Sequence, residues 1–156
     1  MKTTMKKSLA RIFAILLVSM TVCFAGCTTR SSMAFTYNVD TGDTIKVTLD
    51  TAAGHTLSAQ VPFTVSLDGE ALTQGTFIYA DAYQDDVDVV DADEKAELLE
   101  SGSKDGNDYI FWCYDGVEYN YAVLVGGSNT GVILSNTVSE ESARECFNRL
   151  AINVDD

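Results

Sequence analysis

Alternating apolar and polar positions dominate the middle of the chain. The segment 44–50 (TIKVTLD) keeps a strict period of two, and the same period returns through 57–67. This pattern predicts strands that bury one face. Pro62 lies within the second run and cannot donate a backbone hydrogen bond, so we expect a break or a sheet edge there. Asp68-Gly69 then predicts a turn, and 76–82 a further strand.

A second β-rich region extends from 109 to 136 and is interrupted twice by turn residues. Asp115-Gly116 favours a tight hairpin because both residue types tolerate positive φ angles. The segment 126–131 (GGSNTG) lacks the Lys and Ser/Thr ending of a phosphate-binding loop, so it is interpreted as another hairpin connection. The spacing predicts a three-stranded antiparallel meander.

The register of this meander decides which side chains share a face. A two-residue loop would set Trp112 opposite Tyr119 and place Tyr121 on the same side. Such an aromatic face is either core or an exposed stacking platform for a sugar or peptide. Cys113 would then lie on the opposite, mixed face, whereas a helix carrying Cys146 would cover the aromatic one. We therefore predict two separately buried thiols, although an exported protein could oxidise them to a disulfide.

Helical signals appear in two places. Ser139 is placed to cap a C-terminal helix, which the 3.6-residue periodicity extends to Ala151. Asp91 followed by Glu94 suggests a capping box for a shorter middle helix that ends at Gly102. We therefore predict an α+β fold, in which an antiparallel sheet with the meander at 109–136 is packed by these two helices.

The N-terminal segment has a different pattern. Residues 1–11 are basic, with four Lys or Arg and no acid, and the fourteen residues 12–25 are uncharged and mostly apolar. A membrane-spanning helix needs roughly 20 apolar residues. This order and length predict a secretory signal peptide and not a permanent span.

The apolar run ends at Phe24, Ala25, Gly26 and Cys27. This segment resembles the lipobox of bacterial lipoprotein precursors, although Phe24 occupies the position where leucine is commonest, and Cys23 is a rival. The resemblance implies that the Cys27 thiol receives a diacylglyceryl group and that a signal peptidase cleaves before Cys27. Two or more acyl chains give stable membrane attachment. The expected location is the extracytoplasmic face of a cell membrane.

These boundaries divide the chain into a signal peptide at 1–26, a lipidated Cys27 with a tether to residue 34, and one domain at 35–156. Removal of the signal leaves 6 basic against 23 acidic residues, a net charge of −17. Nucleic acid is excluded as a partner, since its binding depends on Lys and Arg neutralising phosphates. The expected partners are the membrane, through the anchor on Cys27, and a protein or glycan.

Candidate chemistry is sparse in the remaining sequence. The acidic stretch 81–94 is interpreted as a solvated face, with Ca²⁺ at Asp85, Asp86, Asp88 and Asp91 as the alternative, because calcium prefers six to eight oxygen ligands. Otherwise we expect no cofactor. His55, the single histidine, is interpreted as an exposed turn residue; a Ser-His-Asp or Cys-His arrangement would have to use it.

No catalytic residue is therefore assigned. The sequence favours a membrane-anchored, non-enzymatic binding or interaction module. The alternatives are a carboxylate-based hydrolase acting on an envelope sugar or other extracellular substrate, and a purely structural role.

Overall fold

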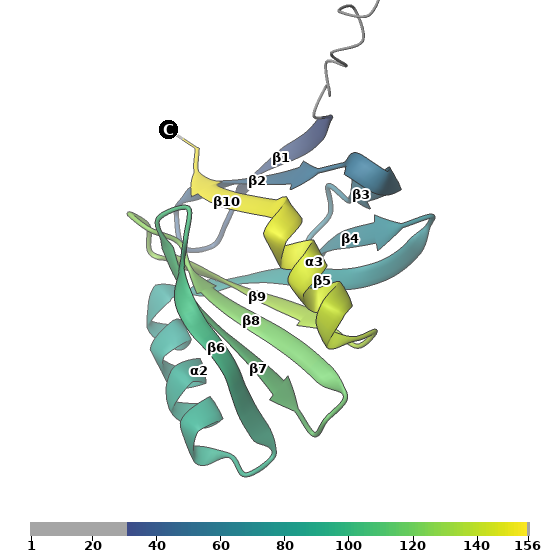
Figure 1. Cartoon of the computed structure of the whole chain (residues 1–156). Helices are drawn as coiled ribbons and strands as arrows, with labels where there is room; N and C mark the ends of the chain where they lie inside the picture. The colour runs from purple at the N-terminus through teal and green to yellow at the C-terminus, as the bar shows by residue number, and fades with distance from the viewer. Residues whose placement is uncertain (1–30, 156) are drawn as a thin grey trace, which may run out of the picture.

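The computed structural model describes residues 31–155. The signal peptide, the lipobox residues Phe24, Ala25 and Gly26, and Cys27 lie outside the described residues. Strands make up 54% of the described part and helices 21%. The fold is therefore mostly β, and its strands form two sheets (Figure 1).

The smaller sheet has three antiparallel strands in the order β1-β2-β10. The larger sheet has seven antiparallel strands in the order β3-β4-β5-β9-β8-β7-β6. The small sheet consists of β1 (Ser32–Asn38), β2 (Thr44–Asp50) and β10 (Leu150–Val154), and a short 3-10 helix, η1 (Ala52–Gly54), follows β2. The large sheet consists of β3 (His55–Leu57), β4 (Phe63–Leu67), β5 (Glu70–Tyr79), β6 (Ala96–Lys104), β7 (Asn107–Tyr114), β8 (Glu118–Leu124) and β9 (Thr130–Asn136).

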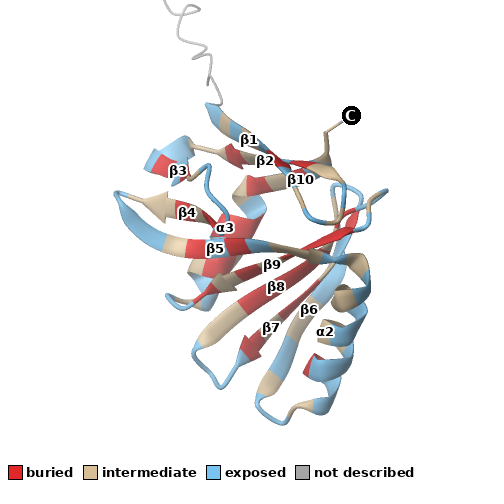
Figure 2. Cartoon of the chain, turned by 180° about the vertical axis from the view of Figure 1, so that it is seen from behind, coloured by how far each residue is buried: buried red, intermediate tan, exposed pale blue. Residues whose placement is uncertain are grey.

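The main core lies between the two sheets, and the helix α3 (Glu140–Arg149) packs into the same layer. Apolar residues of β2 and β10 meet those of β4, β8 and β9 there. The helix α2 (Ala80–Ala92) covers the opposite face of the large sheet, where Val90 packs with Ile110 and Ala122. Figure 2 shows buried segments in β2 and β10 of the small sheet as well as in β7, β8, β9 and α3. Each helix thus covers a different face of the large sheet.

The predicted α+β fold with one sheet and a middle helix is wrong. The structure is a mostly β fold with two sheets, and the middle helix predicted from Asp91 to Gly102 does not exist. Residues 96–104 form β6, which pairs with β7, and the helix lies earlier, at 80–92. An added Cβ at Gly102 would lie 3.1 Å from the Tyr109 hydroxyl. Gly102 therefore lets Tyr109 lie across the edge strand instead of ending a helix.

Other elements agree with the sequence patterns in part. The strand 44–50 is present, the run 57–67 breaks before Phe63, and Ser139 caps α3 by accepting a hydrogen bond from the Ser142 amide at 3.1 Å. However, α3 ends at Arg149 and the chain continues as β10. The strand predicted at 76–82 ends at Tyr79, where α2 begins. Residues 32–34, assigned to the tether from sequence, belong to β1.

The meander β7-β8-β9 is present within the large sheet, but its first register differs from the prediction. Tyr114 pairs with Glu118, so the loop has three residues and Trp112 faces Asn120. A shift of one residue moves every side chain of a strand to the other face. Trp112 therefore packs on the α2 side, while Tyr119 stacks with Phe111 at a centroid distance of 6.4 Å.

Candidate functional site

A groove lies where the end of β5 approaches the β1–β2 connection. It encloses about 330 Å³ and continues past Thr41 and Tyr79 into a second hollow of about 370 Å³ beside the start of α2. We call the two together the β5 groove. Its apolar lining is formed by Val39, Val61, Phe77, Ile78 and Tyr79. Val61 and Tyr79 are 54% and 55% exposed, which leaves large apolar surfaces open inside a concave region.

One wall of the β5 groove is an open sheet edge. On one side, β5 pairs with β9 from Gln74 to Tyr79. On the other side, its ladder with β4 ends where Phe63 pairs with Gly75. The preceding residue, Pro62, has no backbone N–H to continue the ladder. Within the described chain, no strand therefore pairs with Thr76–Tyr79 on the β4 side.

Two carboxylates lie along the β5 groove. Asp40 lines the first hollow and Asp81 the second. Neither forms an ion pair with any residue in 31–155. The Asp81 carboxylate accepts a hydrogen bond from the Ala82 amide at 3.0 Å, and the Tyr79 hydroxyl donates to the Asp40 carbonyl at 3.2 Å. The groove is therefore negatively charged, with its acidic groups open to a ligand.

The basic side chains of the described residues are already engaged elsewhere. Each of them forms an ion pair with a carboxylate: Lys46 with Asp155, Lys95 with Asp115, Lys104 with Asp105, Arg144 with Glu100 and Glu140, and Arg149 with Glu145. Within residues 31–155, no Lys or Arg is therefore left to neutralise the β5 groove, whose charge favours a cationic ligand.

A carboxylate clamp holds one end of the β5 groove in place. The Asp43 carboxylate accepts hydrogen bonds from the Asn129 amide at 2.7 Å, from the Thr130 hydroxyl at 2.8 Å and from the Thr41 hydroxyl at 3.3 Å. The Thr130 hydroxyl bond, aided by the other two, lowers the pKa of Asp43. The Asn129 carbonyl in turn accepts from the Ala80 amide at 2.8 Å, so the same loop orients the start of α2.

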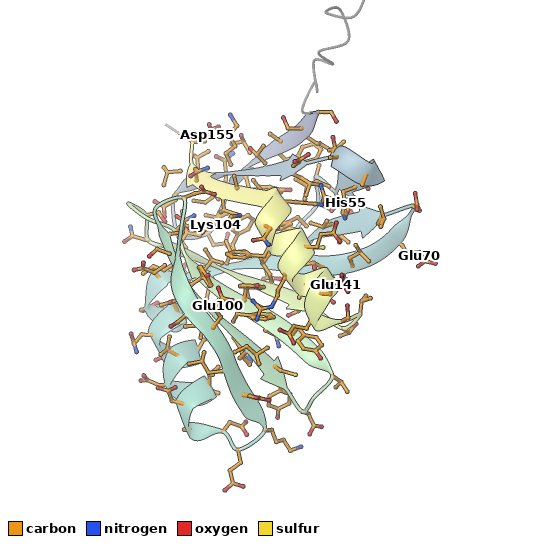
Figure 3. All side chains as sticks on the ribbon, in the orientation of Figure 1. His55, Glu70, Glu100, Lys104, Glu141 and Asp155 are labelled. Atoms are coloured by element: carbon orange, nitrogen blue, oxygen red, sulfur yellow. The ribbon has the colours of Figure 1, made fainter. Side chains whose placement is uncertain are left out.

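A second concave region, of about 410 Å³, lies between β6, β7 and α3. Its charged side chains form hydrogen bonds and ion pairs within the protein. The Tyr109 hydroxyl donates to Glu100 at 2.5 Å, and Arg144 pairs with the same carboxylate. These two hydrogen bonds lower the pKa of Glu100. Lys104 donates to the Phe147 carbonyl at 2.7 Å and to the Leu150 carbonyl at the end of α3 (Figure 3). This network joins α3 to β6.

The chemistry of a carboxylate hydrolase requires one protonated and one charged carboxyl group across a cleft. Among the described residues that line the concave region between β6, β7 and α3, Glu100 is the only acid. Its lowered pKa keeps it charged. Burial and the neighbouring Asp85 raise the pKa of Asp86, but Asp86 lies on α2, across the sheet from α3. Glu100, with its lowered pKa, and Asp86, with its raised pKa, thus do not share a cavity.

The four candidate calcium ligands all lie on α2. Asp85, Asp88 and Asp91 follow one another at intervals of three residues, which spreads them over a rise of about 9 Å along the helix axis. In the described part of the chain, no group of three or more His, Cys, Asp or Glu side chains is arranged to hold a metal ion. These aspartates are close in sequence, but their oxygens do not converge on one point.

The prediction of an exposed His55 is wrong. His55 is the first residue of β3 and is only 2% exposed. Its Nδ1 lies 3.0 Å from the Ala52 carbonyl oxygen, whereas Nε2 has no hydrogen-bond partner and lies 3.9 Å from a Glu145 carboxylate oxygen (Figure 3). Neither neighbour is the Ser or Cys that a Ser-His-Asp or Cys-His arrangement requires. His55 shares the alternating phase of buried Leu57, a signal that could have predicted its burial.

The remaining sequence candidates also have defined positions. Cys113 and Cys146 are both buried and free. The corrected register places Cys113 in phase with Phe111, on the α3 side, so the argument that separated the two thiols by face was wrong. Trp112 and Tyr119 lie on opposite faces and cannot form one stacking platform.

No protein-family model matches the chain, and comparison with curated proteins and with solved structures found no significant match to either. None of the helices in residues 31–155 combines the length and the apolar character that crossing a membrane requires.

Sequence reasoning did not find the residues of the β5 groove. The break at Pro62 was predicted, but the open edge of β5 follows only once the β4–β5 register is known. Val61, Tyr79 and Asp40 come from three separate segments, which meet only in the folded chain.

Proposed function

We propose that the protein is a membrane-anchored bacterial lipoprotein whose domain serves as a non-enzymatic binding module on the outer side of the membrane. The lipobox ending at Cys27 supports the anchor. The β5 groove carries the binding part of the proposal, since it combines exposed apolar side chains, an open sheet edge and unpaired carboxylates.

Binding is favoured over catalysis because of how the polar groups are distributed. Near α3, Glu100 and Tyr109 both have shifted pKa values and are hydrogen-bonded to each other. Polar groups that already have hydrogen-bond partners are typical of a structural network. In the β5 groove, by contrast, apolar surface and carboxylates remain open. A concave apolar site with a few polar groups is the usual form of a binding site.

Incorporation of labelled palmitate by the full chain in a bacterial host tests the anchor. We expect Cys27→Ala to abolish labelling and to leave unprocessed precursor or shed protein. Cys23→Ala is the matched control, since it removes the neighbouring thiol and should leave labelling intact. Labelling that survives Cys27→Ala, or is lost only with Cys23→Ala, would contradict the assignment of the anchor to Cys27.

A further inference from the structure

The β5 groove has a feature that distinguishes one class of ligand from the others. Thr76–Tyr79 are fully paired with β9, but no strand within residues 31–155 pairs with them on the β4 side. In an antiparallel sheet, the backbone groups of successive residues point alternately to the two neighbours. Two of these four residues therefore direct their N–H and C=O groups toward the groove. Only a ligand with a peptide backbone can continue this ladder.

The two outer edges of the large sheet are less suited to accept a strand. At the far side of the large sheet, β6 has a register irregularity between Leu98 and Glu100 and carries charged side chains. Bulges and charges are common means of blocking edge pairing. The opposite edge strand, β3, has only three residues. The open edge in the β5 groove, by contrast, is regular and next to exposed apolar side chains.

The side chains of the β5 groove add a charge preference. Asp40 and Asp81 lie along the two connected hollows and form no ion pair with a described residue. Because each described Lys and Arg is paired elsewhere, a basic ligand supplies the missing positive charge without displacing an internal ion pair. The exposed ring of Tyr79 can also contact the cationic group, a favourable cation–π arrangement.

We infer that the β5 groove binds an extended, basic segment of a partner protein, which adds as a strand to the free edge of β5 at Thr76–Tyr79. Main-chain hydrogen bonds to β5 would provide affinity. Alternate side chains would then select the sequence: apolar ones against Val61 and Phe77, and a Lys or Arg toward Asp40 or Asp81. This inference rests on the proposed binding function and specifies its ligand.

Three synthetic peptides test the inference against the full chain purified in detergent micelles. The first alternates valine and lysine, the second replaces every lysine with glutamate, and the third is the lysine peptide with its outward-facing amides N-methylated. Fluorescence anisotropy of the labelled peptides measures affinity. We expect the first peptide to bind and each of the other two to bind at least about tenfold more weakly.

Two exposed valines provide a matched pair of variants. Val61→Lys puts a positive charge inside the β5 groove, whereas Val138→Lys makes the same change at a site outside it; the two side chains are 54% and 57% exposed. Because both are exposed, neither change should unfold the chain. We expect Val61→Lys to lower the affinity for the valine–lysine peptide at least about tenfold. Val138→Lys should leave this affinity unchanged. Asp81→Asn should lower the affinity for the same peptide by a smaller factor.

The outcomes separate this inference from the broader proposal. Equal affinity for the N-methylated and the unmethylated lysine peptide would overturn strand addition. If Val61→Lys still lowered the affinity in that case, the groove would remain a binding site. Equal effects of Val61→Lys and Val138→Lys would place the peptide elsewhere. Absence of binding by all three peptides would overturn the peptide ligand, while palmitate labelling at Cys27 tests the anchor independently.

Discussion

The two helices differ in how they are held in place. The helix α3 has a side-chain cap at Ser139, ion pairs on its surface and the buried residues Cys146 and Phe147. The helix α2 has no side-chain cap, carries five aspartates, and buries only Val90. Its first amide is instead bound by the Asn129 carbonyl of a neighbouring loop.

This difference separates a structural region from an open one. Around α3, polar groups pair with one another and aromatic rings fill the space between helix and sheet. Around the start of α2, apolar side chains are exposed in the β5 groove, and Asp40 and Asp81 form no ion pair with a residue of the described chain. The region around α3 stabilises the fold, and the region around the start of α2 is the one for which we propose binding.

The largest expected effect comes from truncating the aromatic anchor of α3. The Phe147 ring stacks on Tyr121 at 4.0 Å and meets Tyr109 edge-on at 4.9 Å. Phe147→Ala should lower the free energy of unfolding by roughly 3–5 kcal/mol. Val90→Ala on α2 is the comparison and should cost about 1–2 kcal/mol, because it removes two buried methyl carbons instead of an aromatic ring. Equal losses in urea unfolding would contradict the difference between the helices.

A smaller effect is expected at the cap of α3. Ser139→Ala removes the acceptor for the Ser142 amide and should destabilise the protein by about 1 kcal/mol. Ser139→Asn is the control, since asparagine caps helices about as well as serine. Urea denaturation measures both. A destabilised Ser139→Asn variant, similar to Ser139→Ala, would show that the loss does not come from the cap.

The smallest effect is expected at the Asp43 clamp and depends on pH. Its pKa is lowered from 3.8, chiefly by the Thr130 hydroxyl, so its contribution to stability is present above pH 3.8 and is lost as the pH falls through the lowered value. Asp43→Asn should therefore destabilise the protein near neutral pH and reduce the further loss in acid. Glu70→Gln, at an exposed hairpin position (Figure 3), controls for the removal of one negative charge. Parallel acid-unfolding curves of wild type and Asp43→Asn would contradict the claim that the charged Asp43 carboxylate stabilises the fold.

The sequence predicted those elements whose signals are local. Strict alternation at 44–50 and the cap at Ser139 each depend on residues close in sequence. The carboxylates of 81–94 led to the prediction of a solvated face, whereas Tyr83, Val87 and Val90 lie at i, i+4 and i+7 and form the apolar stripe that packs α2 on the sheet.

The errors came from features that depend on distant segments. The Asp115-Gly116 turn was identified, but the loop also includes Val117, and that one residue exchanged the two faces of β7 relative to β8. His55 is a partial exception, because its shared phase with Leu57 is a local signal of burial, whereas its contact with Glu145 of α3 is not local. The β5 groove requires three segments to meet, and no local pattern contains that information.

Hydrogen exchange of the Thr76–Tyr79 amides is the most direct test of the claim that the β5 groove contains a free strand edge. In the full chain alone, we expect the amides that point away from β9 to exchange rapidly and those bonded to β9 to be protected. The valine–lysine peptide should slow the rapid amides, and its N-methylated form should not. Protection of all four amides before any peptide is added would contradict the account, because the edge would already be covered.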